Sequence, residues 1–172
     1  MKLNEIFTGP YVVFVDMDGV IVNFLRGMKS VFPEYNEEQY QSDKNHKKEA
    51  WTAVKRYEQE GGRFWFDLKP MADANLLWKY TKHLHPEILT ATGSSGSGVG
   101  IQKKDWVAAN LGDGISVHAV SAFKDKAKFA KPGHILIDDM RESIDPWIAA
   151  GGIGILHTSA ANTIAQLKKI GI

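Results

Sequence analysis

An apolar run that ends directly in two acidic residues constrains the fold of this chain more than any other feature. Residues Val12 to Val15 are apolar and mostly β-branched, which is typical of a short strand buried on both faces. Asp16 and Asp18 follow without a spacer, and Gly19 comes next. An ionised carboxylate at the end of a buried strand loses much of its hydration free energy unless a cation compensates it. We therefore expect a cation at this position, and a metal ion is the simplest candidate.

Further apolar segments alternate with helical patterns along the rest of the chain. Residues 87–90, 134–137 and 153–156 resemble the first strand, and 115–120 is a weaker strand candidate. Helices are predicted after Asp73, over 104–111, from Pro146 and over 160–169. Strands that alternate with helices favour βαβ units, so the sequence predicts an α/β fold with a mostly parallel, five-stranded sheet.

The connection between the first two strands is much longer than a crossover between parallel strands requires. Its middle, residues 36–60, is polar and charged and has a helical pattern that ends at Gly61 and Gly62. We interpret residues 26–70 as a small helical cap inserted after the first strand, with residues 1–25 and 71–172 as the core. The alternative is a surface helical excursion.

The composition excludes several classes of function. The formal net charge of the 172 residues is +1, which predicts no membrane-binding basic patch and no general nucleic-acid surface. Cysteine is absent, so disulfides, thiolate metal sites and a cysteine nucleophile are excluded. The sequence has neither an apolar run long enough for a membrane span nor a signal-peptide pattern at its start. The expected location is cytoplasmic.

Reactive residue types follow several of the predicted strands. Thr90 and Thr92 come at the end of the second strand, and Asp138 and Asp139 follow Ile137. Parallel strands bind ligands at their carboxyl ends, so this architecture would gather these side chains with Asp16 and Asp18 at one edge. A carboxylate there can attack phosphorus while Mg²⁺ neutralises the phosphate, and a second carboxylate can move protons. Threonine and a lysine, such as Lys126 or Lys128, can hold the transferring oxygens.

The same segments resemble the four motifs of the haloacid dehalogenase-like phosphatase superfamily. The stretch Asp16-Met17-Asp18-Gly19-Val20 is similar to the first motif, and Thr90 after Ile88-Leu89 to the second. Lys126 is similar to the lysine of the third motif, and Ile137-Asp138-Asp139 resembles the fourth. The resemblance implies a Rossmann-like three-layer α/β/α core and a cap inserted after the first motif.

A closer resemblance is to the 5'(3')-deoxyribonucleotidases. Phe24 stands eight residues after Asp16, and Phe64-Trp65-Phe66-Asp67-Leu68-Lys69-Pro70 looks like the aromatic cluster of that family. Leu136 to Asp139 also matches its fourth motif. Two departures are that Thr90 is followed by Ala91-Thr92-Gly93 rather than Ser-Pro, and that Met140 separates Asp139 from Arg141.

The resemblance assigns roles to individual residues. Asp16 is implied to be the nucleophile and a Mg²⁺ ligand, and Asp18 the general acid and base, with a backbone carbonyl on the metal. Asp138 is implied to be a further metal ligand and Asp139 to support the ligands. The other implied roles are phosphoryl binding by Thr90 and Lys126, and substrate contact by Phe24, Phe64, Trp65, Phe66, Ala91 and Thr92.

Some alternatives stay open at this stage. Asp139 is also suited to capping a helix, and Lys126 to a solvated basic face with Lys128. Residues 93–100 are rich in glycine and serine, which favours a mobile lid or a linker. In an extended segment, Phe64 to Phe66 would point alternately to the core and to the cleft.

The expected function is Mg²⁺-dependent hydrolysis of a phosphate monoester, with a (deoxy)nucleoside monophosphate as the favoured substrate. The alternatives are another small phosphate ester, the terminal phosphate of a nucleic acid, or a binding module without turnover. A homodimer is also an open alternative.

Overall fold

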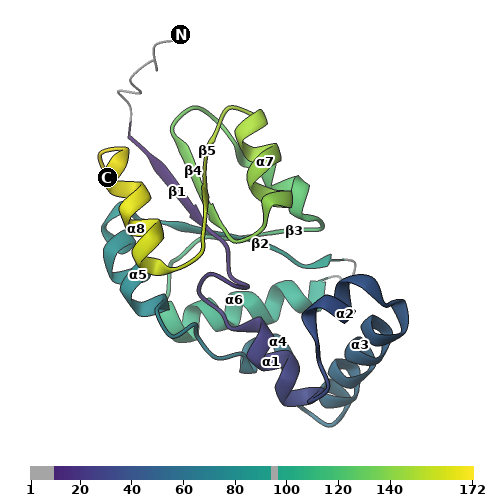
Figure 1. Ribbon diagram of the computed structural model, residues 1–172. Helices are drawn as coiled ribbons and strands as arrows, with labels where there is room; N and C mark the ends of the chain where they lie inside the picture. Colours follow the sequence, from purple (N-terminus) through teal and green to yellow (C-terminus); the bar gives the residue numbers. More distant parts are fainter. Residues whose placement is uncertain (1–9, 94–96) are drawn as a thin grey trace.

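A five-stranded sheet forms the centre of the molecule (Figure 1), which the computed structural model describes for residues 10–93 and 97–172. Its strands are β1 (Val12–Val15), β2 (Glu87–Ala91), β3 (Val117–Val120), β4 (His134–Asp138) and β5 (Ile153–Leu156). All neighbouring strands are parallel, in the order β3-β2-β1-β4-β5. The predicted α/β class with a parallel sheet is therefore confirmed.

Helices cover both faces of this sheet. On one face, α5 (Ala74–Thr81), α6 (Ser97–Leu111) and α8 (Ala160–Lys169) pack against alternate strand residues such as Val13 and Val15. On the other face, α7 (Arg141–Ala149) and the 3-10 helix η3 (Phe123–Phe129) pack against Phe14, whose ring lies 5.5 Å from that of Trp147. A second 3-10 helix, η1 (Lys82–Leu84), follows α5. The result is the three-layer arrangement that the resemblance implied.

Two helix starts and one helix cap differ from the sequence prediction. Helix α6 begins at Ser97 rather than Lys104, so residues 97–100 of the Gly/Ser segment are helical; residues 94–96 lie outside the described part. Helix α7 begins at Arg141, and Pro146 lies inside it rather than at its start. The Asp73 side chain does not cap α5; it accepts a hydrogen bond from the Ala160 N–H at the start of α8.

Four helices precede α5 in the long connection between β1 and β2. They are α1 (Phe24–Val31), α2 (Glu37–Ser42), α3 (Lys44–Gln59) and α4 (Phe64–Asp67). The single helix predicted over 36–60 is wrong, because the extended backbone of Asp43 divides it and the Asp43 side chain caps α3. Phe64 to Phe66 form a helical turn rather than an extended segment.

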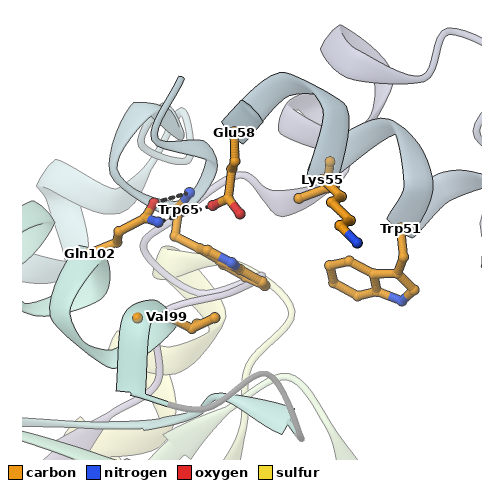
Figure 2. A pocket seen from close by; sticks show the side chains of 8 residues that line it. Trp51, Lys55, Glu58, Trp65, Val99 and Gln102 are labelled. Atoms are coloured by element: carbon orange, nitrogen blue, oxygen red, sulfur yellow. Dashed lines mark hydrogen bonds between the residues drawn. The ribbon is translucent and has the colours of Figure 1, made fainter. Parts of the chain in front are cut away.

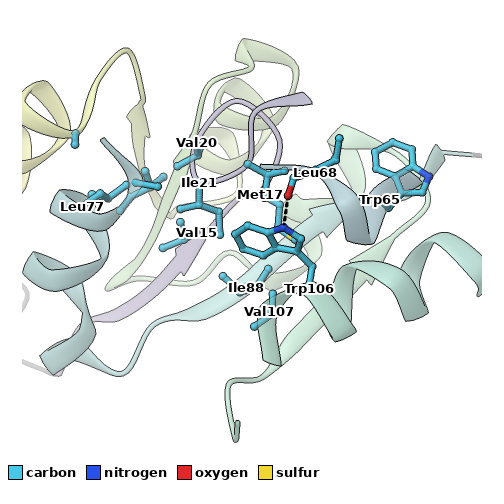
Figure 3. Packing of buried hydrophobic residues seen from close by; sticks show 14 of the residues in the cluster. Val15, Met17, Val20, Ile21, Trp65, Leu68, Leu77, Ile88, Trp106 and Val107 are labelled. Carbon is cyan, nitrogen blue, oxygen red and sulfur yellow. Dashed lines mark hydrogen bonds between the residues drawn. The ribbon is translucent and has the colours of Figure 1, made fainter. Parts of the chain in front are cut away.

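The two ends of the segment that contains α1 to α4 lie next to each other. Val22 forms an antiparallel bridge with Pro70, and the Asn23 N–H donates to the Lys69 carbonyl. Figure 1 shows α1 to α4 grouped beyond the carboxyl ends of the strands, next to α6. The buried indole of Trp106 on α6 donates to the Leu68 carbonyl over 2.8 Å (Figure 3). Helix α6 therefore joins the sheet to the inserted helices. Among the described residues, none of the helices combines the length and apolarity that crossing a bilayer requires.

Candidate active site

Asp16 and Asp138 lie side by side at the carboxyl ends of β1 and β4. The parallel register pairs Val15 with Ile137, so the next residue of each strand is an aspartate. The Asp16 N–H donates to the Ile137 carbonyl over 2.9 Å and fixes this alignment. Both side chains are buried, and burial in this position disfavours two unneutralised charges.

A third carboxylate completes a cluster that fits a metal ion. One oxygen each from Asp16, Asp138 and Asp139 lie within 4.8 Å of one another. Gly19 lies against Asp139 with φ +78°, and a Cβ at Gly19 would meet the Asp139 Oδ2 at 2.1 Å. Among the described residues, the buried Oδ1 atoms of Asp18 and Asp139 have no hydrogen-bond partner. Clustered, unpartnered carboxylate oxygens are the donor set that Mg²⁺ prefers.

Lys126, and not Lys128, joins this cluster. The buried Lys126 Nζ lies 2.8 Å from the Asp16 Oδ1 and 2.6 Å from the Asp138 Oδ2. Lys128 is 75% exposed and pairs with Asp125 instead. Of the two lysines that the sequence left open, Lys126 is the one that lies at the carboxylates.

A second buried lysine, Lys103 on α6, was not identified from the sequence. Its Nζ lies 2.6 Å from the Asp18 Oδ2, 2.9 Å from the Thr90 Oγ1 and 2.9 Å from the Ala91 carbonyl. A signal for it existed: Lys103 is three and four residues before Trp106 and Val107, the apolar face of that helix. A lysine on the apolar face of a helix is buried only where acidic or polar groups pair with its ammonium group.

The charges in the cluster do not balance. Four carboxylates (Asp16, Asp18, Asp138 and Asp139) face two ammonium groups (Lys103 and Lys126), which leaves a formal charge of −2. A divalent cation would neutralise this excess.

The pKa values of these groups report the same excess of negative charge. Burial raises the pKa of Asp139 to about 7, and the charges of Asp16 and Asp138 act in the same direction. Burial and the Asp16 charge raise the pKa of Asp138 to about 6, against the influence of Lys126. Burial also raises the pKa of Asp18, although Lys103 counteracts it. Burial lowers the pKa of Lys126, but the charges of Asp16 and Asp138 outweigh it and the net shift is upward.

The side chains and carbonyls at the end of β2 face either the cluster or the neighbouring strand. The Thr90 hydroxyl and the Ala91 carbonyl both contact Lys103, so they lie at the cluster. The Thr92 hydroxyl instead lies 3.2 Å from the Val120 carbonyl of β3 and donates to it. The Thr92 side chain is therefore held by the neighbouring strand.

The inserted helices and α6 enclose a cavity of about 270 Å³ (Figure 2). Its lining residues are Trp51, Val54, Lys55, Glu58, Trp65, Gly98, Val99 and Gln102. Of the aromatic residues predicted to contact substrate, Trp65 lines this cavity. Phe24 stacks on Trp65 with ring centroids 5.6 Å apart, whereas Phe64 is buried and Phe66 packs under Arg63. Trp51, Lys55, Glu58 and Gln102 were not identified from the sequence.

Solved structures with the same fold include hydrolases and a phosphoglucomutase-like protein. A hydrolase from Streptococcus pneumoniae TIGR4 superposes with a TM-score of 0.58 at 11% identity, over 93% of this chain and 100% of that chain. A haloacid dehalogenase-like family hydrolase from Xanthomonas campestris gives 0.58 at 10% identity, over 93% and 91%. A candidate β-phosphoglucomutase from Thermotoga maritima gives 0.56 at 14% identity, over 92% and 99%.

These likenesses extend to the fold alone, and they confirm the predicted Rossmann-like core. The sequence itself matches no family model and no curated protein. Closeness to the nucleotidases is therefore a proposal and depends on the site.

Proposed function

We propose that the chain is a Mg²⁺-dependent phosphatase that hydrolyses phosphate monoesters through an aspartyl-phosphate, and that a nucleoside monophosphate is its favoured substrate. The observation that carries this proposal is the cluster of Asp16, Asp138 and Asp139 against two buried lysines at the carboxyl edge of the sheet. Structural ion pairs alone do not explain a cluster that retains unpartnered oxygens and excess negative charge.

Asp16, Asp138 and the Asp18 carbonyl would hold Mg²⁺, with Asp139 supporting them. When bound, the ion would reduce the repulsion between the Asp16 carboxylate and a phosphate dianion. Lys126 uses two of its three N–H donors on Asp16 and Asp138, so its third donor is available for a phosphoryl oxygen. Thr90 receives a hydrogen bond from Lys103 on its oxygen, which directs its own O–H toward a substrate oxygen.

In the first step, an Asp16 carboxylate oxygen forms a bond to phosphorus while the bond from phosphorus to the leaving oxygen breaks. The Asp18 carboxyl gives its proton to that leaving oxygen, so an alcohol departs. A carboxyl whose pKa is raised by burial is suited to carry this proton near neutral pH.

In the second step, Asp18 takes a proton from water, and the water oxygen attacks phosphorus. The bond between phosphorus and Asp16 breaks, which regenerates the Asp16 carboxylate and releases inorganic phosphate. Asp18 is thus an acid in one step and a base in the other, as one group must be when both steps occur at one phosphorus.

The nucleotide preference rests on the cavity next to the cluster. Lys103 Nζ lies 4.7 Å from the centre of the Trp65 ring and also contacts Asp18. A leaving group that accepts a proton from Asp18 would therefore extend toward Trp65 and the cavity. Indole rings favour a flat, partly apolar group such as a nucleobase. In this proposal, residues 26–70 are a cap that supplies substrate contacts.

A screen of phosphate esters with and without Mg²⁺ tests the proposal. Nucleoside monophosphates, sugar phosphates, a 5'-phosphorylated oligonucleotide and p-nitrophenyl phosphate would be compared by phosphate release. We expect hydrolysis that EDTA abolishes and excess Mg²⁺ restores, with nucleotides preferred. Release of no phosphate from any ester, alongside measurable Mg²⁺ binding, would show a binding module instead.

A further inference from the structure

The cavity between α3, α4 and α6 has a polar wall as well as an aromatic one. Glu58 and Lys55 of α3 line one side of it, and Trp65 and Val99 line the other (Figure 2). The rings of Trp51 and Trp65 lie 6.1 Å apart and are nearly parallel, at the separation of rings in direct contact. A flat ligand would therefore lie against the indoles and not between them.

Backbone N–H groups of α4 fix the orientation of the Gln102 side chain. Gln102 in turn holds the Glu58 carboxylate. The Gln102 Oε1 accepts from the Trp65 N–H at 3.0 Å and from the Phe66 N–H at 3.4 Å. Its amide nitrogen must then face the other way, where it donates to the Glu58 Oε1 over 2.9 Å. In the described part of the chain the Glu58 carboxylate has no other hydrogen-bond partner, so its second oxygen is available to a ligand.

Lys55 is a donor in the same cavity. It lies three residues before Glu58 on α3, a spacing at which opposite charges commonly pair. Among the described residues, neither side chain takes part in a salt bridge, although both line the cavity. The cavity therefore presents an acceptor and a donor next to a flat apolar wall.

We infer that this cavity selects a heterocyclic leaving group whose edge carries adjacent N–H donors beside a carbonyl, which is the edge of guanine. One donor of guanine matches the free oxygen of Glu58, the other matches the remaining lone pair of the Glu58 Oε1, and the guanine carbonyl matches the Lys55 ammonium. Uracil and thymine would place a carbonyl on each side of their single N–H, against the carboxylate. A sugar would leave the indoles without a flat partner.

This inference rests on the proposed phosphatase function, so its test separates the two. The kcat/KM values of wild type, Glu58→Gln and the matched control Glu60→Gln are measured with guanosine, inosine and uridine 5'-monophosphates and with p-nitrophenyl phosphate. Glu60 ends the same helix and is exposed outside the cavity. p-Nitrophenyl phosphate reports the chemistry without a base.

We expect wild type to prefer the guanine nucleotide over the uracil nucleotide, with the inosine nucleotide between them because it lacks one donor. Glu58→Gln should lower kcat/KM for the guanine nucleotide at least about tenfold and leave p-nitrophenyl phosphate within about twofold. Equal values for all three bases, or an equal loss in Glu60→Gln, would overturn the inference.

Inactivity of wild type toward all four esters would instead reject the phosphatase. The cavity is then tested by measuring the equilibrium binding of guanosine 5'-monophosphate with calorimetry. Weaker binding to Glu58→Gln than to Glu60→Gln would support the selection of guanine, and equal binding would reject it.

Discussion

Replacement of Lys103 by methionine should lower turnover while it strengthens Mg²⁺ binding. The Lys103 side chain is 1% exposed and donates to Asp18, Thr90 and the Ala91 carbonyl. These contacts hold the group that moves protons and the hydroxyl that binds the phosphoryl oxygens. Methionine keeps the length and apolar packing of the side chain but removes all three donors.

The expected loss of activity follows from these contacts. Removal of one positioned donor from a site where charge develops typically costs about 3 kcal/mol, or roughly a hundredfold in kcat. The formal charge of the cluster would change from −2 to −3, since four carboxylates would then face Lys126 alone. A divalent cation should bind more tightly to the more negative site.

Both quantities can be measured on the same preparations. kcat and KM are determined with p-nitrophenyl phosphate at saturating Mg²⁺, and the Mg²⁺ affinity is determined by calorimetry. Lys104→Met is the matched control, because Lys104 is the next residue on α6 and is exposed. Thermal unfolding of each variant checks that the fold is retained. Activity of Lys103→Met within threefold of wild type, or weaker Mg²⁺ binding, would refute the reasoning.

Three further predictions concern other parts of the molecule. Asp16→Asn should reduce phosphate release at least about a thousandfold with little change in melting temperature, because it removes the proposed nucleophile; near wild-type activity in Mg²⁺ would reject the mechanism. Gly19→Ala should displace the Asp139 carboxylate, since the added Cβ would lie 2.1 Å from its Oδ2, and the backbone strain should cost about 1–2 kcal/mol; an unchanged Mg²⁺ requirement for activity would show that the Asp139 position is immaterial. Burial and the nearby Glu37 charge raise the pKa of Tyr35 from 10.0 to about 12, so the unfolded chain ionises first and stability should fall between pH 10 and pH 12. Denaturant unfolding should show that the free energy of unfolding falls by about 3 kcal/mol over this pH range in wild type and not in Tyr35→Phe. An equal fall in both proteins would contradict the assignment to Tyr35.

The strands and the carboxylates could be predicted from the sequence because their signals are local. Val12 to Val15 form a continuous apolar run, and a residue that follows such a strand must lie at its carboxyl end. Parallel pairing of β1 with β4 then brings Asp16 and Asp138 together without any loop-dependent geometry. This is why the aspartates that were proposed from the motifs are found in one cluster.

Lys103 was missed because the start of its helix could not be inferred locally. Gly98 and Gly100 are poor helix formers, so the pattern appeared to begin at Lys104. In the structure α6 begins at Ser97, and Trp106 and Val107 are buried against the core. The packing of those two residues outweighs the low propensity of the glycines, and it places Lys103 on the buried side of the helix.

The cavity residues were missed for a different reason. Trp51 and Glu58 lie on α3, whereas Trp65 lies on α4 and Gln102 on α6, so their proximity depends on how three helices pack. The prediction of one helix over residues 36–60 did not give the direction of α3. Asp43 sets that direction, because its extended backbone turns the chain between α2 and α3.

The contacts between α6 and the inserted helices determine how a substrate could enter. Arg63 pairs with Asp105, Gln102 binds the Trp65 N–H, and Trp106 donates to the Leu68 carbonyl. Withdrawal of the inserted helices as a unit would break these hydrogen bonds, each worth about 1 kcal/mol, and would expose the buried indole of Trp106. Such an opening is therefore costly, while the cavity already reaches Trp65 next to Lys103. We therefore propose that a substrate approaches the carboxylate cluster from the cavity side, past Glu58 and Lys55.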